Sequence, residues 1–374
     1  MIILIKKNKL ISILIILMFI FSLIITIYIK LNSLQKTSVS LDEEVKALLL
    51  LEIKQIFNTR NRAILEKKSE ILKNIYNRDL RNGRWAHAHE LKKLNYLHQW
   101  SKKQGVKFTD INSHVIVRRL SKQGEKYRAN LMVSTEYQYN YQDSDIDNIC
   151  RIGTYHSLDL MESDQKLVIS REWYTDPFAD SLHMDSTNSE QVKEIVLSKK
   201  KNDLSGLSEK RMKAVSYIDR YCGAASLPKY GFQYNNNYKN FNHLGGDCAN
   251  FASQMLHEGG GFPKDGTWNY YGGSGSRAWV NAHAFNNYMN YSGRASQIAR
   301  GSYTSVLKAS YKLLPGDYIA YEKKGKVVHI SVVSGRDSRG YTLVNSHNTD
   351  RYRVPWDLGW SNSEIKFRLM RVHY

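Results

Sequence analysis

Cys248 is the residue whose surroundings most clearly predict chemistry. It lies in the stretch HLGGDCANFASQMLHEGG, after a Gly-Gly turn and Asp247 and before an apolar helical stripe. We therefore expect a helix that begins at Cys248. The free main-chain N–H groups and the positive dipole end of a helix start favour a thiolate, and the same N–H groups can bind an oxyanion. The alternative, a small buried side chain at a helix start, fits the polar neighbours Asn250 and Ser253 poorly.

A thiol nucleophile needs a base, and the base needs an orienting group. His329, in the predicted strand VVHISVV, is the candidate base. A lone histidine among apolar neighbours would usually be a core residue, but a reactive thiol upstream favours the catalytic role. In the next predicted strand, YTLVNSH, alternation places Asn345 and His347 on one face. Either of these two side chains could orient His329.

Five segments carry a resemblance to a known family. They read GGDCANFASQMLHEGG, RAWVNAHAFNNYM, LLPGDYIAY, VVHISVV and VNSHNTDRYRVPW. In this order they resemble the bacterial putative amidase domain family, a relative of the NlpC-type and CHAP-type cell-wall amidases in the papain-like superfamily. The resemblance covers residues 210–374 and implies a cysteine amidase or peptidase that uses Cys248 and His329. The stretch HNTD departs from the family's H-T-x-D pattern, so His347 and Asn345 both remain candidates for the third position.

The N-terminus predicts a membrane segment. Three early lysines precede an uncharged apolar run over residues 10–29, and Lys30 closes it. At about 1.5 Å per residue this run spans a bilayer core. We expect a signal-anchor over residues 1–30, with the remainder of the chain extracellular. A cleaved signal peptide, which would make the protein secreted, is the alternative, although no A-x-A-like site is seen before Ser40.

The chain beyond this segment divides into two differently patterned regions. Residues 41–178 read as long helices followed by four antiparallel strands, an α+β arrangement for which we expect a cystatin-like topology. Residues 179–206 are polar and predict a linker. Residues 207–374 are the expected papain-like amidase domain, also of α+β class.

Charge and cysteine content limit the partners. The chain holds 54 Lys and Arg against 35 Asp and Glu, a net charge of +19. Such a surface attracts polyanions, and anionic wall polymers are expected partners. Nucleic acid is not expected, because the basic residues are spread along the chain. The alternative explanation of the positive charge is that the host organism uses Lys freely in all its proteins.

Cys150, Cys222 and Cys248 form no CxxC motif, so neither a metal nor a cofactor is predicted. A buried free thiol is expected at Cys222.

These features combine into one functional hypothesis. The sequence predicts an extracellular, membrane-anchored cysteine amidase or peptidase that hydrolyses peptide or amide bonds of the cell wall. One alternative is a catalytically silent module that binds wall or protein ligands in the papain-like cleft. A further alternative is an acyl transferase of transglutaminase type, which would need an amine acceptor site.

Overall fold

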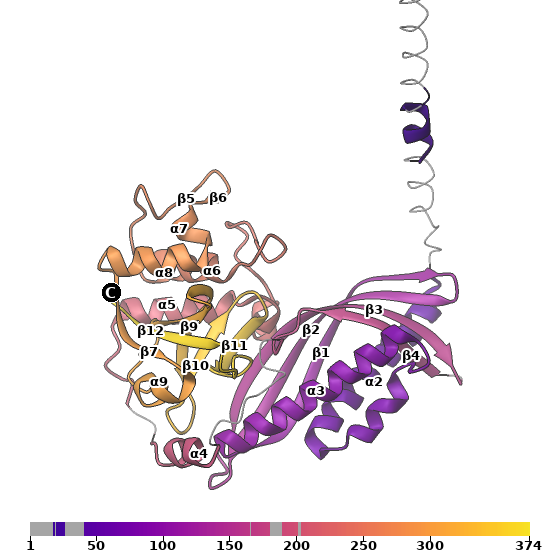
Figure 1. Cartoon of the computed structure of the whole chain (residues 1–374), viewed down its shortest axis with the longest axis horizontal. Coiled ribbons are helices and arrows are strands. Elements are labelled where there is room, and N and C mark those ends of the chain that lie inside the picture. The colour runs from indigo at the N-terminus through magenta and orange to yellow at the C-terminus, as the bar shows by residue number, and fades with distance from the viewer. Residues whose placement is uncertain (1–17, 19, 27–40, 165, 180–188, 201–202) are drawn as a thin grey trace, which may run out of the picture.

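The computed structural model describes residues 18, 20–26, 41–164, 166–179, 189–200 and 203–374 (Figure 1). Within this described part, no helix combines the length and the apolar character needed to cross a membrane. This finding contradicts the predicted transmembrane helix over residues 1–30 and the single-pass membrane localisation built on it. Much of the apolar run over residues 10–29, on which that prediction rested, lies outside the described residues.

The N-terminal region packs two long helices on one face of a four-stranded antiparallel meander (Figure 1). The predicted succession of helices and four strands is confirmed. On one face of the first helix, hydrophobic residues recur every three or four positions and are buried, as at Leu49, Ile53 and Ile56. The elements are α2 (Glu43–Glu66), η1 (Ser69–Ile75), α3 (Arg81–Gln104), β1 (Val106–Gln123), β2 (Lys126–Tyr141), β3 (Asn148–Ser163) and β4 (Lys166–Tyr174).

Gly83 allows a close backbone contact within the helical part of this region. It lies inside α3, where a Cβ atom would be only 1.8 Å from the carbonyl oxygen of Asn77. Glycine is therefore required at this position by the close approach of another part of the backbone rather than by a helix end.

The predicted linker contains one further helix, α4 (Ser189–Leu197). Its buried residues Val192 and Val196 belong to the same hydrophobic core as α3. Residues 180–188 and 201–202 of the predicted linker lie outside the described residues.

The C-terminal region places helices on both faces of its part of the sheet (Figure 1). Strands β8 to β12 and β7 form the sheet; α5 to α8 belong to the core on one face, and α9 belongs to the core on the other. The helices are α5 (Glu209–Arg220), η2 (Gly223–Ala225), η3 (Pro228–Tyr230), α6 (Cys248–Gln254), the π-helical turn η4 (Met255–Gly259), α7 (Arg277–Val280), α8 (Ala282–Tyr291) and α9 (Tyr303–Ser310). The strands are β5 (Tyr270–Tyr271), β6 (Ser274–Gly275), β7 (Ala295–Gly301), β8 (Tyr318–Lys323), β9 (Lys326–Arg336), β10 (Thr342–Ser346), β11 (Asp350–Pro355) and β12 (Ile365–Val372).

The two regions share one antiparallel sheet. Its order is β1-β2-β3-β11-β10-β9-β8-β12-β7, with β4 also paired to β3. The junction is the pairing of β3 with β11, in which Asp350, Arg351 and Tyr352 lie opposite Gly153, Ile152 and Arg151. The α+β class predicted for both regions is what the structure has, but the regions meet through a continuous hydrogen-bonded sheet.

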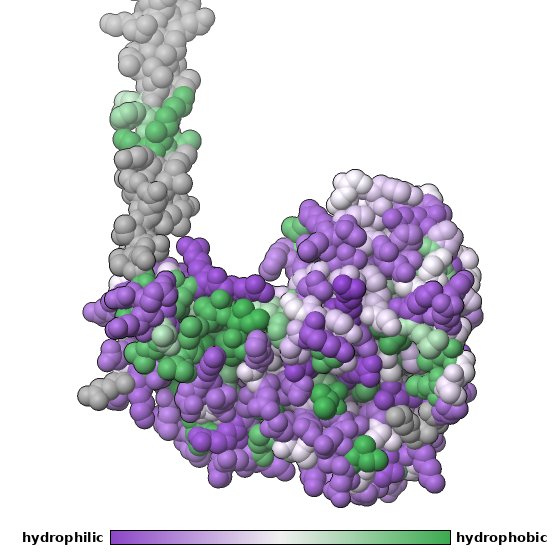
Figure 2. Space-filling model, turned by 180° about the vertical axis from the view of Figure 1, so that it is seen from behind, coloured by the Kyte–Doolittle hydropathy of each residue, from purple (hydrophilic) through white to green (hydrophobic). Residues whose placement is uncertain are grey.

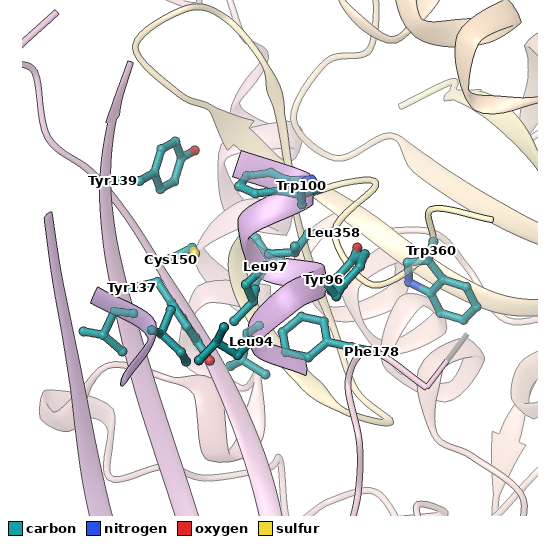
Figure 3. Packing of buried hydrophobic residues seen from close by; sticks show 14 of the residues in the cluster. Leu94, Tyr96, Leu97, Trp100, Tyr137, Tyr139, Cys150, Phe178, Leu358 and Trp360 are labelled. Carbon is teal, nitrogen blue, oxygen red and sulfur yellow. The ribbon is translucent and has the colours of Figure 1, made fainter. Parts of the chain in front are cut away.

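A hydrophobic core also crosses this boundary. Figure 3 shows Trp100 and Tyr96 of α3 between the strands of the N-terminal region and Leu358 and Trp360 of the C-terminal region. A buried ion pair joins the same parts, with Lys103 Nζ 2.5 Å from an Asp357 carboxylate oxygen. These contacts couple the two regions. That residues 41–178 and 207–374 fold as independent domains therefore stays a prediction.

The face shown in Figure 2 is mainly hydrophilic, and its largest hydrophobic area lies over the N-terminal region. Exposed leucines occur in the first half of α2, at Leu48, Leu50 and Leu51. The hydrophilic remainder is in keeping with the excess of Lys and Arg in the sequence.

Candidate active site

Cys248 is the first residue of α6, as the sequence predicted. The helix has seven residues and continues into the π-helical turn η4, which ends at Gly259. Its remaining residues are buried against β9 and neighbouring helices in a core that includes Phe251, Ala252 and Ile330. This packing fixes the thiol over the middle of the C-terminal sheet.

The Cys248 thiol is buried and faces main-chain donors. Only 6% of the residue is exposed. Burial raises the pKa of the thiol to about 11, and the Asp247 charge acts in the same direction. Hydrogen bonds from the main chain of Ile330, Ala249 and Cys248 itself act against this and favour the thiolate. In this conformation the thiol is therefore protonated at neutral pH, although donors for a thiolate are already in place.

Asp247 connects the start of α6 to His347. One carboxylate oxygen lies 2.6 Å from Nδ1 of His347, and the other accepts hydrogen bonds from the Phe241 main chain and the Asn250 amide. Asp247 makes no side-chain capping bond to α6, contrary to the usual role of Asp before a helix. Asp247, which directly precedes Cys248, thus fixes the imidazole of His347.

His347 is bonded at both ring nitrogens. Its Nε2 lies 2.6 Å from the main-chain oxygen of Tyr221, and its ring stacks on Phe251 at a centroid distance of 3.8 Å. A carbonyl can only accept, so Nε2 carries a proton. Burial lowers the pKa of His347, but the hydrogen bond and charge of Asp247 outweigh it, so the pKa is raised above its ordinary value. The pair is best described as imidazolium and carboxylate.

His329 does not face Cys248. Its ring lies 5.0 Å from that of Trp360 and 5.4 Å from that of Tyr321, both in the core on the opposite side of the sheet. Burial, assisted by the positive charge of Arg351, lowers the pKa of His329 to about 3, and Nε2 has no hydrogen-bond partner among the described residues. The neighbouring Ile330 packs with Cys248 instead.

His329 faces the core on the opposite side of the sheet because β9 alternates regularly from His329 to Val333, and Val333 belongs to the same core as Tyr321. A β-bulge lies just before His329. Tyr321 pairs with His329 and Glu322 with Val327, so Val328 is the extra residue in β9. The bulge resets the alternation of side chains, and Val327 and Ile330 both reach the Cys248 core while His329 faces away. Sequence alternation alone does not reveal such an insertion.

Asn345 lies on the same face as His347 but does not contact His329. Its amide donates to the Ile218 carbonyl and to Asp219, and its oxygen accepts from the Arg353 main chain. These bonds fasten β10 and β11 to α5. The structure therefore brings Cys248, Asp247 and His347 to one face of the sheet, with Asn345 as a nearby scaffold residue.

Residues that the sequence did not single out complete the polar surroundings. Asp350 of β11 accepts hydrogen bonds from the Ala224 main chain, at 2.8 Å, and from Tyr234, whose hydroxyl also bonds to Tyr155 of β3 at 2.9 Å. Burial raises the pKa of Asp350 to about 6, although the positive charge of His347 acts against this. The N-terminal region thus reaches the candidate site through Tyr155.

All three cysteines are free and buried, which confirms the expected free thiol at Cys222. Burial raises the pKa of Cys150 to about 12 and that of Cys222 well above its ordinary value. Cys248 has the least perturbed thiol of the three.

Cys248 directly follows the carboxylate residue of a carboxylate–imidazole pair and begins a helix that packs on the same face of the sheet as His347, an arrangement suited to acyl-transfer chemistry. Residues 208–370 match the family described as putative amidase domain, which supports the resemblance seen in the sequence and indicates an amide hydrolase. The match covers nearly the whole of the predicted domain 207–374.

A curated protein of Bacillus subtilis (strain 168), the uncharacterized protein YhbB, is 32% identical over 145 residues. The alignment covers 37% of this chain and 44% of that protein, so the chain spans less than half the length of this relative. Among solved structures, the intermembrane space region of the chloroplast protein ARC6 is similar over 36% of this chain and 97% of its own, at 10% identity. Its TM-score of 0.24 is too low to carry an argument about the fold.

Proposed function

We propose that residues 208–370 form a thiol-dependent amidase in which Cys248 is the nucleophile and His347, oriented by Asp247, is the imidazole partner. The observation that carries this proposal is the 2.6 Å bond between Asp247 and His347, made by the residue directly before Cys248. His347 is favoured over His329 because it lies on the Cys248 face of the sheet, against Phe251 of the same helix.

The reaction would follow the usual order of thiol acyl transfer. The Cys248 thiol loses its proton to the imidazole, and the thiolate attacks the amide carbonyl carbon. The C–N bond then breaks, and the departing amine takes the proton from the imidazolium. Water attacks the thioester and releases the carboxylic acid with the free thiol. In this conformation His347 is an imidazolium whose Nε2–H is bonded to the Tyr221 carbonyl, so before it can act as the base the ring must leave that carbonyl and release its Nε2 proton to solvent.

For the substrate, we propose peptide or amide bonds of the cell wall. The net charge of +19 supports this choice, since anionic polymers accompany such bonds in the wall and would attract a basic protein. We therefore also propose that the protein binds these anionic wall polymers.

A catalytically silent binding module is the second candidate. Three observations favour it: the burial of Cys248, the high pKa of its thiol, and the position of His329 in the core on the opposite side of the sheet. In that case, the Asp247–His347 pair would be a structural ion pair that fixes β10 to the start of α6.

The test uses the full chain with purified peptidoglycan, and mass spectrometry to detect newly formed amino and carboxyl ends. We expect fragment release by the natural protein, none by Cys248→Ala, and a loss of about a thousandfold or more for His347→Ala, as for other imidazole partners of a nucleophile. His329→Phe is the matched control and should retain activity. Loss of activity in His329→Phe with retention in His347→Ala would contradict the assigned base. Binding without cleavage would select the silent module.

A further inference from the structure

A groove in the N-terminal region is bordered by two exposed tryptophans. Trp85 of α3 is 59% exposed and Trp173 of β4 is 61% exposed, although tryptophan is usually among the more buried residues. Both line one hollow of about 480 Å³, which lies in the size range of ligand clefts. Two indoles at one groove indicate a binding surface rather than scattered exposure.

The groove is built on regular elements. One side of the groove is a face of α3 that carries Asn82, Trp85 and His89. The other side carries Trp173 of β4 and Asp176, which follows that strand. Since other residues of α3 and β4 belong to the buried core of this region, the main chain that carries the two indoles is held in place. Neither indole N–H donates a hydrogen bond to another described residue.

Polar groups at the groove are already oriented. His89 Nε2 lies 2.9 Å from one carboxylate oxygen of Asp176, whose other oxygen accepts from the Phe178 main chain at 2.8 Å. The exposed Asn82 amide also lines the groove and makes no hydrogen bond to another described residue. Fixed hydrogen-bonding groups between aromatic walls suit a ligand that has both hydroxyl groups and apolar faces.

The charges of the groove argue against an anionic ligand. Arg171 lines the groove and is paired with Asp159 at 2.7 Å, whereas Arg81 does not line it and places its guanidinium 4.4 Å from the centre of the Trp85 ring. Asp176 adds a negative charge. A phosphate-bearing ligand would be expected to meet unpaired cations, so a neutral ligand fits better.

We propose that this groove binds a neutral oligosaccharide, with pyranose rings against Trp85 and Trp173 and hydroxyl groups bonded to Asn82 and the His89–Asp176 pair. Pyranose rings present C–H faces that pack on indole, and their hydroxyl groups match the amide, imidazole and carboxylate of the groove. The site is remote in sequence from Cys248 and does not depend on the proposed amidase activity.

The test is calorimetric titration of the full chain with tetra-N-acetylchitotetraose and with cellotetraose. We expect saturable binding of at least one of them, weakened about tenfold or more in Trp85→Ala and in Trp173→Ala. Tyr291→Ala is the matched control, because Tyr291 is an exposed aromatic residue, 87% accessible, at the end of α8.

Because both indoles are exposed, their removal should leave the fold intact, which circular dichroism and thermal unfolding would verify. Binding that survives in both tryptophan variants, or that falls equally in Tyr291→Ala, would overturn the site. The absence of saturable binding of either sugar would overturn the ligand class. Binding of wall peptides, but not of sugars, in the same groove would also reject the oligosaccharide assignment.

Discussion

Asp247 and His347 are joined by a 2.6 Å hydrogen bond although 100 residues separate them in the sequence. Both side chains are almost fully buried, with exposed fractions of 1%. A buried carboxylate and imidazolium are costly to separate, because loss of either partner leaves an uncompensated charge. This pair therefore couples the nucleophile helix to the end of β10, whatever its role in the reaction.

Replacement of Asp247 should lower the pKa of His347. Asp247→Asn keeps the shape but removes the charge that raises this pKa, so the ring should titrate at a lower pH. A raised folded pKa stabilises the protein below the unfolded value of about 6.5, and this contribution is lost as pH rises through the folded pKa. NMR titration of the imidazole C–H signals measures the shift. An unchanged pKa in Asp247→Asn would show that the pair is not formed.

His329→Phe should flatten the acid side of the stability profile. Neutral His329 stabilises the fold fully above about pH 6.5, and this contribution falls as pH drops towards its folded pKa of about 3. The natural protein should therefore lose about 1.4 kcal/mol per pH unit more than the variant in this window. Urea unfolding at several pH values gives the difference. Equal slopes would mean that His329 is not buried in its neutral form.

The three thiols should differ in their reaction with iodoacetamide. The pKa is raised to about 11 for Cys248 and about 12 for Cys150, and Cys222 is fully buried. In the folded protein Cys248 should react first, at a rate that rises about tenfold per pH unit near neutrality because only the thiolate reacts. Peptide mapping after timed quenching reports the order. Earlier modification of Cys222 would contradict the described packing.

Gly153→Ala should disturb the junction between the two regions. An added Cβ would lie 2.5 Å from Cβ of Ala224, whose N–H donates to Asp350. Overpacking of this kind costs about 1–3 kcal/mol. Gly206→Ala is the control, because nothing lies within 4 Å of its added carbon. Denaturant unfolding gives the free energy of unfolding of each variant. Equal values would contradict the close packing of η2 on β3.

The two regions should associate when they are produced as separate chains. Residues 41–200 and 203–374 share the β3–β11 ladder and the buried Lys103–Asp357 pair, so they should co-purify without a covalent link. Lys103→Ala should weaken the association, because it leaves the Asp357 charge buried and unpaired. Size-exclusion chromatography of the mixture gives the result. Two separate, folded species would support independent domains as the sequence predicted.

Local patterns in the sequence determined much of the secondary structure and the nucleophile candidate. Local patterning predicted the long helices and the four strands β1 to β4 over residues 41–178, and the GGDC turn predicted the start of α6 at Cys248. Each of these signals acts over a few residues, which is the range that propensity and capping cover.

Only the tertiary structure decided which imidazole lies near the thiol and how the two regions meet. His329 pairs with Tyr321 and lies in the core opposite Cys248, whereas the Asp247–His347 bond spans 100 residues and lies on the Cys248 face. The apolar run at the N-terminus suggested a membrane helix that the described part of the chain does not contain. Side-chain phase, strand order and long-range pairing depend on packing between distant segments, and no local pattern encodes them.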